Sequence, residues 1–391
     1  MSNIASIAAG LLTGLISPQQ HSHGDPTNDE QYVLETMNRA RFDPFGEGLR
    51  LGIDPREGLE PAEAERVGRR PPLAFNLALL EAARAHSRDM HRRSFFDHVN
   101  PDLLDPGMRA ANAGYFGSRV GENIAAGSNP ALHSSAQLHD LLVIDATVEG
   151  RGHRKHILDV SATDPPVYRE VGIGYAAFPE PNAKGFRAFL TEEFGRRSVG
   201  PFLLGVVFHD ANRNGFYDPG EGIPGVEIRH DRGSSWAATS SSGGYACSVG
   251  THGTVTVTPS GGGVPWPASV VKKARLEGEN VKVDFTTSDA SDTDSDGMPD
   301  AWETRYGFNP GVSSDADLDS DGDEMTNLEE FQYSTAPNDP ASRLGSAPAA
   351  PPFTPAPADS GDEDSSCGSG GLDLLLVLAV LLARRHRRIV Y

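Results

Sequence analysis

Cysteine is scarce in this sequence of 391 residues, which holds only Cys247 and Cys367. Cys247 lies in an alternating run typical of a strand, whereas Cys367 lies in a Gly/Ser-rich tail. We expect no disulfide between two such segments, so the cysteines do not indicate an oxidising or a reducing compartment. We interpret Cys247 as a core residue rather than a nucleophile.

Positive charge is also in short supply, because 34 Lys and Arg stand against 54 Asp and Glu, a formal net charge of -20. No basic stripe offsets this field, which argues against nucleic acid as a partner. The acidity is concentrated in one segment. Residues 289–330 contain fourteen Asp or Glu and one basic residue, Arg305, a balance of -13 that leaves about -7 for the rest of the chain.

Familiar catalytic signatures are missing as well. The sequence has no Gly-x-Ser-x-Gly elbow and no His-Glu-x-x-His helix motif. The residues alone therefore predict no catalytic machinery, and binding is favoured over enzymatic activity.

What is present favours several packed domains. Apolar residues make up 38% of the chain, enough for hydrophobic cores, while 43 glycines and 29 prolines indicate many turns and linkers. The length predicts two or three domains. An apolar stretch at 4–16 precedes the first basic residue, Arg39, and we interpret residues 1–24 as a signal or leader segment.

Helical periodicity dominates the region that follows. Thr27 and Glu30 form a capping box, and the apolar spacing after them predicts an amphipathic helix. A Gly/Pro-rich loop is expected over residues 42–72, and a second, longer helix over 73–93. Strand-like runs follow at 171–177 and 186–194.

The pattern changes after residue 202. Short β runs separated by Gly, Ser and Pro turns predict a small β-sandwich. The runs are 203–208, 226–229, 245–249, 254–258 and the alternating Val281, Val283 and Phe285.

Three motifs lie between the long helix and the strands that close the first region. They are Phe-Phe-Asp-His at 95–98, Gly-Glu-Asn-Ile at 121–124, and Gly-His-Arg-Lys-His-Ile-Leu at 152–158, followed by Glu-Val-Gly-Ile-Gly at 170–174. In this order they resemble the CAP superfamily, which includes plant pathogenesis-related and cysteine-rich secretory proteins. The match spans about residues 29–197 and is closest to the disulfide-free bacterial branch, the SCP-like domains. The resemblance implies an α-β-α sandwich with a shallow cleft.

In that cleft the resemblance implies a meeting of His98, Glu122 and His153. Two imidazoles and a carboxylate can hold a divalent ion such as zinc and leave one position open. They can equally form a hydrogen-bonded cluster in which Glu122 orients both rings. Most members of the superfamily have a second glutamate in this cleft. No residue of this sequence matches it securely, and Asp145 and Glu149 are the candidates for its place. A structural network, reversible metal binding and zinc-assisted hydrolysis are the alternatives.

Oxygen-bearing side chains recur at the spacing of a twelve-residue calcium loop, in which positions 1, 3, 5, 7, 9 and 12 supply ligands and position 6 turns sharply. The first copy has Gly215 at position 6. Its ligand positions are Asp210, Asn212, Asn214, Phe216 (through the carbonyl), Asp218 and Glu221. The surrounding residues, 205–226, resemble the B-type repeat modules of bacterial surface adhesins, which are prealbumin-like β-sandwiches.

Two more copies of the loop follow in the acidic segment. One has Gly297 at position 6, and the other has Glu324 where glycine is expected, which predicts weaker binding or a different bend. Their ligand positions are Asp292, Asp294, Asp296, Met298, Asp300 and Glu303 in the first, and Asp319, Asp321, Asp323, Met325, Asn327 and Glu330 in the second. The pair resembles thrombospondin type 3 and related calcium repeats of bacterial surface proteins.

We therefore expect Ca²⁺ as a cofactor, and we expect residues 289–340 to become ordered only with calcium. Without cations the carboxylates repel one another, and few apolar residues offset the entropy of ordering the chain. The apolar nucleus of the pair is expected to consist of Trp302, Tyr306, Phe308 and Phe331.

The C-terminus combines small residues around Cys367, an apolar run at 372–383 interrupted by Asp373, and four arginines within 384–388. Twelve helical residues span about 18 Å, which is short of a ~30 Å hydrocarbon core. The segment resembles bacterial C-terminal sorting signals of the myxobacterial and glycine-glycine types. The resemblance implies processing or lipidation at Cys367, and a permanent short membrane anchor is the alternative.

Taken together, the sequence predicts an α+β protein located at the cell exterior or in the cell envelope. The expected order is a leader (1–24), a CAP domain (25–200), a β-sandwich (201–288), irregular calcium-loop repeats (289–340), a Pro-rich and acidic disordered linker (341–366) and a sorting or anchor segment (367–391). The expected role is binding or adhesion, with a lipid, glycan or protein ligand in the CAP cleft and membrane contact through the C-terminal segment. A zinc-assisted hydrolase is the alternative.

Overall fold

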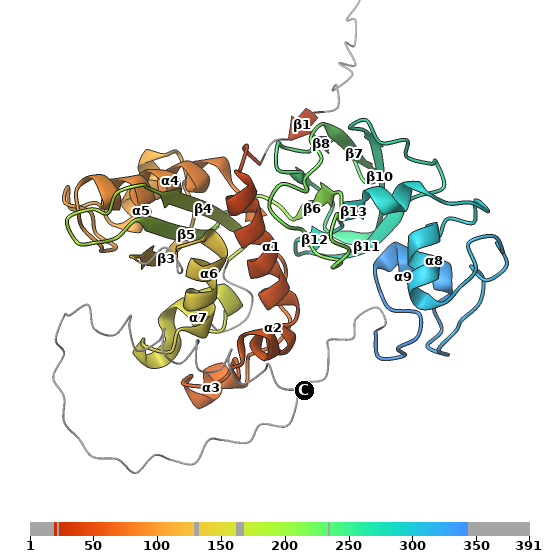
Figure 1. The fold of residues 1–391 in the computed structure, drawn as a ribbon, viewed down its shortest axis with the longest axis horizontal. Coiled ribbons are helices and arrows are strands. Elements are labelled where there is room, and N and C mark those ends of the chain that lie inside the picture. The colour runs from red at the N-terminus through yellow and green to blue at the C-terminus, as the bar shows by residue number, and fades with distance from the viewer. Residues whose placement is uncertain (1–18, 22, 129–132, 162–167, 234, 343–391) are drawn as a thin grey trace, which may run out of the picture.

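The structure, a computed structural model, describes residues 19–21, 23–128, 133–161, 168–233 and 235–342 (Figure 1). These residues form three β-sheets together with helices, which confirms the predicted mixture of α and β structure. We refer to residues 23–199 as the head, residues 201–286 together with the strand at 19–21 as the sandwich, and residues 287–342 as the stalk. The predicted sorting segment with Cys367, most of the leader and nearly all of the linker lie outside the described residues.

The first helix, α1 (Asn28–Phe42), begins at the predicted capping box. The Thr27 side chain accepts a hydrogen bond from the backbone N–H of Glu30, and the Glu30 carboxylate accepts one from the backbone N–H of Thr27. Both bonds satisfy amide groups that the first helical turn leaves without partners. The apolar face of the helix, with Val33 and Met37 completely buried, packs into the core of the head.

The prediction of a continuous loop over residues 42–72 is wrong. Two short helices lie there, α2 (Pro44–Leu51) and α3 (Pro61–Ala64). Each begins with proline, whose fixed φ suits the first helical position, and Asp43 caps α2 by accepting a hydrogen bond from the backbone N–H of Gly46 at 2.9 Å. The glycine and proline content concealed these start signals.

The central sheet of the head has four strands in the order β2-β4-β5-β3. Their bounds are β2 (Ala74–Phe75), β3 (Arg119–Gly127), β4 (Glu170–Ala177) and β5 (Ala188–Arg196). The helices that accompany the sheet are α4 (Leu77–Arg92), α5 (Pro106–Asn112), α6 (Ser135–Ile144), the 3-10 turn η1 (Glu149–Arg151) and α7 (Gly152–Leu158). Helix α4 packs on one face of the sheet, and α1, α6 and α7 pack on the other, so the head has three layers (Figure 1).

Two glycines explain how closely α4 approaches the sheet. A Cβ atom on Gly172 would lie 2.0 Å from the backbone of Leu79, and one on Gly174 would lie 2.3 Å from the backbone of Ala83. Any larger residue at either position of β4 would push the helix away from the strand. The Gly-x-Gly pattern of this strand is therefore a packing requirement of the three layers.

The sandwich consists of two sheets. One has the order β1-β8-β7-β10-β11, and in the other β6 pairs with β9, β12 and β13. The strands of the first sheet are β1 (Gln19–His21), β7 (Val226–His230), β8 (Ser235–Ala238), β10 (His252–Gly261) and β11 (Lys272–Glu277), and those of the second are β6 (Phe202–Phe208), β9 (Gly244–Ser248), β12 (Val281–Lys282) and β13 (Phe285–Thr286). Inward-facing residues of both sheets form one hydrophobic core, which includes the buried Cys247.

Head and sandwich share an extensive contact. The amide of Asn280 donates to the backbone carbonyls of Pro72 and Arg169 at 3.0 and 2.8 Å and accepts from the backbone N–H of Phe202 at 2.9 Å. Beside it, Lys282 Nζ lies 2.8 Å from Glu35 Oε2 of α1, whose side chain is 3% exposed. The two parts are therefore joined by buried hydrogen bonds and an ion pair rather than by a linker alone.

The stalk contains a 3-10 turn η2 (Thr287–Ala290) and two short helices, α8 (Asp300–Tyr306) and α9 (Asn327–Tyr333). Helix α9 packs on β11 of the sandwich, and the Tyr333 hydroxyl lies 3.5 Å from that of Thr254. The Trp302 ring stacks on Phe308 with ring centres 5.7 Å apart, meets Phe331 edge-on at 5.7 Å and lies 4.9 Å from Tyr306, so the predicted aromatic residues do come together. Within the parts of the chain that the structure describes, no helix is both long and apolar enough to cross a membrane.

Candidate functional site

In the head, His98 and Glu122 are in direct contact. His98 Nδ1 lies 2.8 Å from Glu122 Oε1, with the imidazole about half exposed and the carboxylate buried. Arg109 of α5 donates to the other oxygen of Glu122 and also to the backbone carbonyls of His98 and Leu104. The guanidinium therefore neutralises Glu122 and fixes the loop that carries His98.

His153 makes a different contact. Its Nδ1 lies 2.8 Å from Asp145 Oδ1, and its backbone N–H donates to Asp145 Oδ2 at 2.9 Å. Asp145 ends α6 with a left-handed φ of 49° and is buried. Of the two candidates for the second acidic position, Asp145 thus orients His153, whereas Glu149 is exposed in η1.

An open cavity of about 840 Å³ lies where α5 meets the start of β3. His98, Glu122 and His156 line it together with the aromatic residues Tyr115, Phe116 and Tyr168, whereas His153 does not. The cavity therefore offers both polar and apolar surface.

His156 is held from behind by a chain of buried polar groups. Its Nδ1 lies 2.9 Å from Asn123 Oδ1, and the Asn123 amide donates to Glu192 Oε2 at 3.1 Å. Glu192 Oε1 lies 2.6 Å from His139 Nδ1, and both of these side chains are fully buried. Burial lowers the pKa of His156, so the ring is neutral at neutral pH.

As they lie, the residues proposed for zinc do not fit that metal. Both oxygens of Glu122 are engaged by His98 and Arg109, and His153 is paired with Asp145. A zinc site needs ligand atoms that converge on one point about 2 Å away, without a competing cation on the carboxylate. Among the described residues, none of the groups of ligand atoms close enough to share an ion includes His98, Glu122 and His153. We derive no catalytic step from them.

The three predicted calcium loops share one backbone design. We name them the sandwich loop (210–221), the first stalk loop (292–303) and the second stalk loop (319–330). In each loop the carboxylate at position 1 accepts a hydrogen bond from the backbone N–H of position 6. The pairs are Asp210 with Gly215 (2.9 Å), Asp292 with Gly297 (3.2 Å) and Asp319 with Glu324 (3.0 Å).

Position 6 has a positive φ in all three loops, 75° at Gly215, 97° at Gly297 and 77° at Glu324. The second stalk loop therefore bends like the other two although it lacks the glycine. A non-glycine residue in this region costs about 1 kcal/mol of backbone strain. The bend is retained because the Asp319 carboxylate holds the turn.

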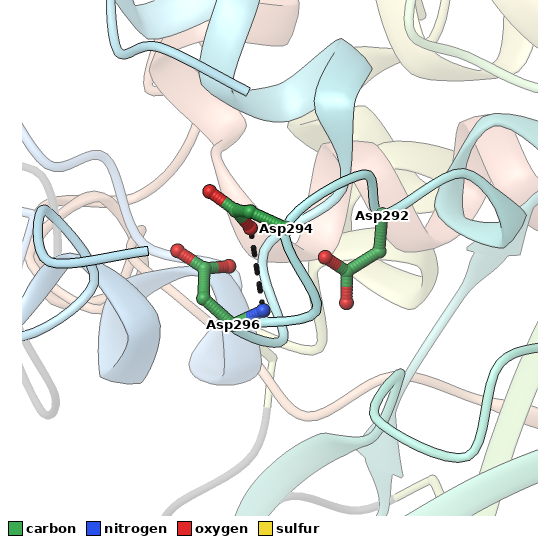
Figure 2. A group of neighbouring side chains, drawn as sticks. All are labelled: Asp292, Asp294 and Asp296. Atoms are coloured by element: carbon green, nitrogen blue, oxygen red, sulfur yellow. Dashed lines mark hydrogen bonds between the residues drawn. The ribbon is translucent and has the colours of Figure 1, made fainter. Parts of the chain in front are cut away.

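The first stalk loop gathers carboxylates. Asp292, Asp294 and Asp296 have oxygens within 4.8 Å of one another, the separation that ligands of a single ion can have, and Figure 2 shows all three on one tight turn, with Asp294 accepting from the backbone N–H of Asp296 at 3.3 Å. A second group of the same kind joins Asp296 to Glu303 and Asp315. Asp315 comes from the segment between the stalk loops, which the loop template does not include.

Asp300, the ninth position of this loop, is directed elsewhere. Its carboxylate accepts from the Ser291 hydroxyl at 2.6 Å and from the backbone N–H and hydroxyl of Thr293 at 2.7 and 2.8 Å. These bonds hold the pKa of Asp300 below its usual range. In this loop Asp300 therefore stabilises the backbone through hydrogen bonds, and Asp315 takes its place among the clustered carboxylates.

The second stalk loop repeats the arrangement. Oxygens of Asp319, Asp321 and Asp323 lie within 4.8 Å of one another. Glu330 at position 12 and Asn327 at position 9 are both fully buried. Met325 at position 7 donates its N–H to Asp323 at 2.9 Å, as Met298 does to Asp296 at 2.8 Å in the first stalk loop.

The buried glutamates of the stalk are the most unusual feature of the site. Glu303 and Glu330 have no exposed surface, and neither oxygen of either carboxylate has a hydrogen-bond partner among the described residues. Burial, with the neighbouring aspartates adding, raises the pKa of each glutamate to about 7 and that of Asp296 to about 6. Leaving such groups without partners is costly, because a buried charge must be paired or must bind a metal.

The sandwich loop differs in this respect. Asp218 Oδ2 accepts from the amides of Asn212 and Asn214 at 2.6 and 2.8 Å, and Glu221 accepts from the backbone N–H groups of Ala211 and Asp218, both at 2.9 Å. Its oxygens are therefore satisfied by the protein. Phe216 lies against α1 of the head, where the Arg39 guanidinium is 4.2 Å from its ring centre.

Sequence reasoning missed two residues of these sites. Arg109 is an ordinary arginine in a short helix, and only the folded chain shows that it contacts Glu122. Asp315 lies in an acidic stretch but outside both twelve-residue templates, so no spacing rule selects it.

Comparison with known proteins gives partial likenesses. No family model matches the chain. The uncharacterized protein YkwD of Bacillus subtilis (strain 168) is 32% identical over 117 residues, which are 30% of this chain and 39% of the relative, so the chain spans about two fifths of that relative's length.

Two solved structures are also similar in part. One is an extracellular protein containing an SCP domain from Bacillus anthracis, at 21% identity, a TM-score of 0.28 and coverage of 43% of this chain and 40% of that one. The other is an outer surface protein from Borrelia burgdorferi, at 11% identity and a TM-score of 0.28, covering 45% and 97%. A TM-score of 0.28 is too low to transfer a fold, and those names describe those two proteins alone.

Proposed function

We propose that this chain is a secreted or surface-displayed bacterial protein in which a CAP-type head is supported by calcium-binding modules and binds a ligand at the cell exterior. The observation that carries the proposal is the pair of buried glutamates, Glu303 and Glu330, each beside a triplet of aspartates and without any partner among the residues that the structure describes.

Calcium suits these sites better than other common cations. It takes six to eight oxygen ligands, including the bidentate glutamate at position 12, in flexible geometry, whereas magnesium demands a near-ideal octahedron and keeps several waters. The stalk offers only oxygen, with no sulfur or imidazole among the clustered groups, which disfavours zinc. Burial, with repulsion from the neighbouring aspartates adding, raises the pKa of Glu303, and a bound dication would offset both effects.

The exterior location follows from the affinity expected of such loops. Extracellular calcium modules bind at about 10⁻⁴–10⁻³ M, a range in which the cation is available outside the cell. The C-terminal segment with Cys367 would then hold the protein at the envelope, as a processed or lipidated terminus or as a short anchor.

For the head, the proposal of a CAP domain depends on the ordered motifs and on their placement. The motifs at 95–98 and 121–124 meet in the His98–Glu122 contact, and the three layers match what the resemblance implies. The cavity beside them is the proposed ligand site. Its aromatic wall includes Phe116, which is 80% exposed and thus available to an apolar part of a lipid, glycan or protein.

The calcium part is tested by limited proteolysis and circular dichroism of the full chain in calcium, in magnesium and in chelator. We expect cleavage within 289–340 to be suppressed by calcium at millimolar concentration and not by equal magnesium. Identical digestion patterns in all three conditions would remove the basis of the proposal.

The ligand part is tested by comparing Phe116→Ser with Leu49→Ser in liposome flotation and glycan-array binding. Leu49 is 72% exposed on α2 and does not line the cavity, so it controls for lost surface hydrophobicity. Binding that is weakened by Phe116→Ser alone places the ligand at the cavity, and equal effects of the two changes would exclude it.

A further inference from the structure

The segment between the stalk loops connects two groups of unpartnered oxygens. Asp315 has one carboxylate oxygen without a partner, grouped with Asp296 and Glu303 of the first stalk loop. Its other oxygen accepts weakly from the backbone N–H of Asn309 at 3.3 Å. The free oxygen is therefore available to a cation held by the first stalk loop.

The backbone of the same segment is held by the second stalk loop. The carbonyl of Asp315 accepts from the side-chain amide of Asn327 at 2.8 Å, and the Asn327 backbone N–H donates to Leu318 at 2.7 Å. Next to these bonds, Leu328 donates its backbone N–H to the carbonyl of Ala316 at 3.1 Å. The segment is thus fixed to the start of α9.

The nitrogen and the oxygen of the Asn327 side-chain amide have different surroundings. It is completely buried, its amide nitrogen holds Asp315, and its amide oxygen has no partner within the described chain. Position 9 is a ligand position of the loop template, and the Asn327 oxygen is buried without a partner, as are both carboxylate oxygens of Glu330 in the same loop. One side chain therefore connects the backbone of a ligand of the first site to the interior of the second.

Apolar packing reinforces the connection. Met298, at position 7 of the first stalk loop, shares a small buried cluster with Ala316 and with Phe331 of α9. Ordering either loop therefore reduces the entropy lost on ordering the other, because both use the same cluster.

We propose that Asp315 is a calcium ligand of the first stalk loop and that, through Asn327, it makes the two stalk sites bind calcium cooperatively. This inference rests on the proposed calcium binding and goes beyond it, because it assigns a ligand outside the loop template and a coupling between sites. Occupation of the first site pulls Asp315 into place and holds Asn327, which presents its oxygen to the second cation. Coupling of this kind commonly amounts to a factor of 5–150 in affinity.

The test is hydrogen–deuterium exchange of the full chain, followed by mass spectrometry across a series of free calcium concentrations. Peptides from the two stalk loops report each site separately, and peptides from the head report whether the rest of the protein is folded. The variant is Asp315→Asn. The matched control is Asp317→Asn. It removes the same charge from an exposed residue that lies two positions after Asp315 in the sequence.

We expect both stalk loops of the unchanged protein to become protected at one common calcium midpoint. Asp315→Asn should raise that midpoint at least about tenfold for both loops, and Asp317→Asn should leave it within about twofold, with head peptides unchanged in each case.

Different failures have different meanings. If Asp315→Asn behaves like Asp317→Asn while the unchanged protein responds to calcium, Asp315 is not a ligand and the inference is overturned, although calcium binding stands. A shift confined to the first stalk loop overturns the coupling. If calcium protects neither loop of the unchanged protein, the proposed function fails, and the inference fails with it.

Discussion

Glu303 and Asp296 lie with carboxylate oxygens within 4.8 Å of each other, although the Glu303 side chain is fully buried and nothing in the described chain hydrogen-bonds to its carboxylate. Two like charges at this separation, one of them buried, destabilise the fold unless one is protonated or a cation lies between them. This relationship is the physical basis of the calcium proposal, because the same geometry is unfavourable without an ion and favourable with one.

Glu303→Gln should therefore have effects of opposite sign in the two conditions. In chelator the variant should melt at a higher temperature than the unchanged protein, because a buried charge is removed. In millimolar calcium it should melt at a lower temperature, because the bidentate ligand is lost. Differential scanning calorimetry measures both, and Glu324→Gln, an exposed acid of the second stalk loop, is the control that should change little. A shift of the same sign in both conditions would contradict the assignment of Glu303 as a ligand.

The strained turn of the second stalk loop gives a simple gain-of-stability prediction. Glu324 adopts φ 77°, so Glu324→Gly should relieve about 1 kcal/mol of strain and lower the calcium concentration needed for protection of that loop. The reciprocal change, Gly297→Ala in the first stalk loop, should raise the calcium concentration needed for protection of the first stalk loop. Exchange midpoints of the two loops provide the measurement, and weaker binding after Glu324→Gly would show that the side chain itself contributes.

The ion pair between head and sandwich should show strong coupling. Lys282→Met leaves Glu35 buried without its cation, at a cost of about 3 kcal/mol, whereas Lys282→Met combined with Glu35→Gln should recover most of that loss. Urea unfolding of the single and double variants gives the coupling free energy. Additive losses would mean that the two side chains do not interact in solution.

The stability of the folded protein should depend on pH through Glu193 in the head. It is buried beside Glu122 and has no partner among the described side chains, and burial, with the Glu122 charge adding, raises its pKa to about 9. The unfolded chain loses this proton above about pH 4.5 while the folded protein keeps it, so stability falls as the pH rises from about 4.5 to about 9. Glu193→Gln should remove this contribution.

Urea midpoints therefore should be higher for Glu193→Gln than for the unchanged protein at pH 8, and nearly equal at pH 4.5. The opposite order would place a charged carboxylate, with a partner, at this position.

Cys247 is expected to be inert. It has no exposed surface, and burial raises the pKa of its thiol to about 12, so the thiolate that reacts is nearly absent at pH 8. In a Cys367→Ser background, a colorimetric thiol reagent should detect no cysteine until denaturant is added. Rapid labelling of the folded protein would show that the sandwich core opens readily.

Local signals predicted much of the fold. The Thr27–Glu30 capping box predicted the start of α1, and short apolar runs bounded by Gly, Ser and Pro turns indicated β6, β7 and β9. The same approach failed for β3, whose Gly-Glu-Asn sequence shows no strand alternation and which is extended because it pairs with β5 over nine residues. It also missed α2 and α3, where proline begins a helix instead of ending one.

The site residues also fall into two classes, those that a local spacing pattern predicts and those that only the folded chain brings together. The stalk carboxylates come from neighbouring residues of one turn, so a spacing rule selects Asp292, Asp294 and Asp296 together. Asp315 and Arg109 reach their partners through the folded chain, across twelve and thirteen residues from Glu303 and Glu122, and no local pattern encodes such contacts.

Equilibrium dialysis of the full chain against about 1 mM free calcium, within the range expected for extracellular modules, tests the central claim most directly. We predict at least two calcium ions bound per chain, one for each stalk loop, and the loss of both in the Glu303→Gln/Glu330→Gln double variant while the head and sandwich stay folded. A chain that binds no calcium at this concentration, or a double variant that binds as much as the unchanged protein, would contradict the account.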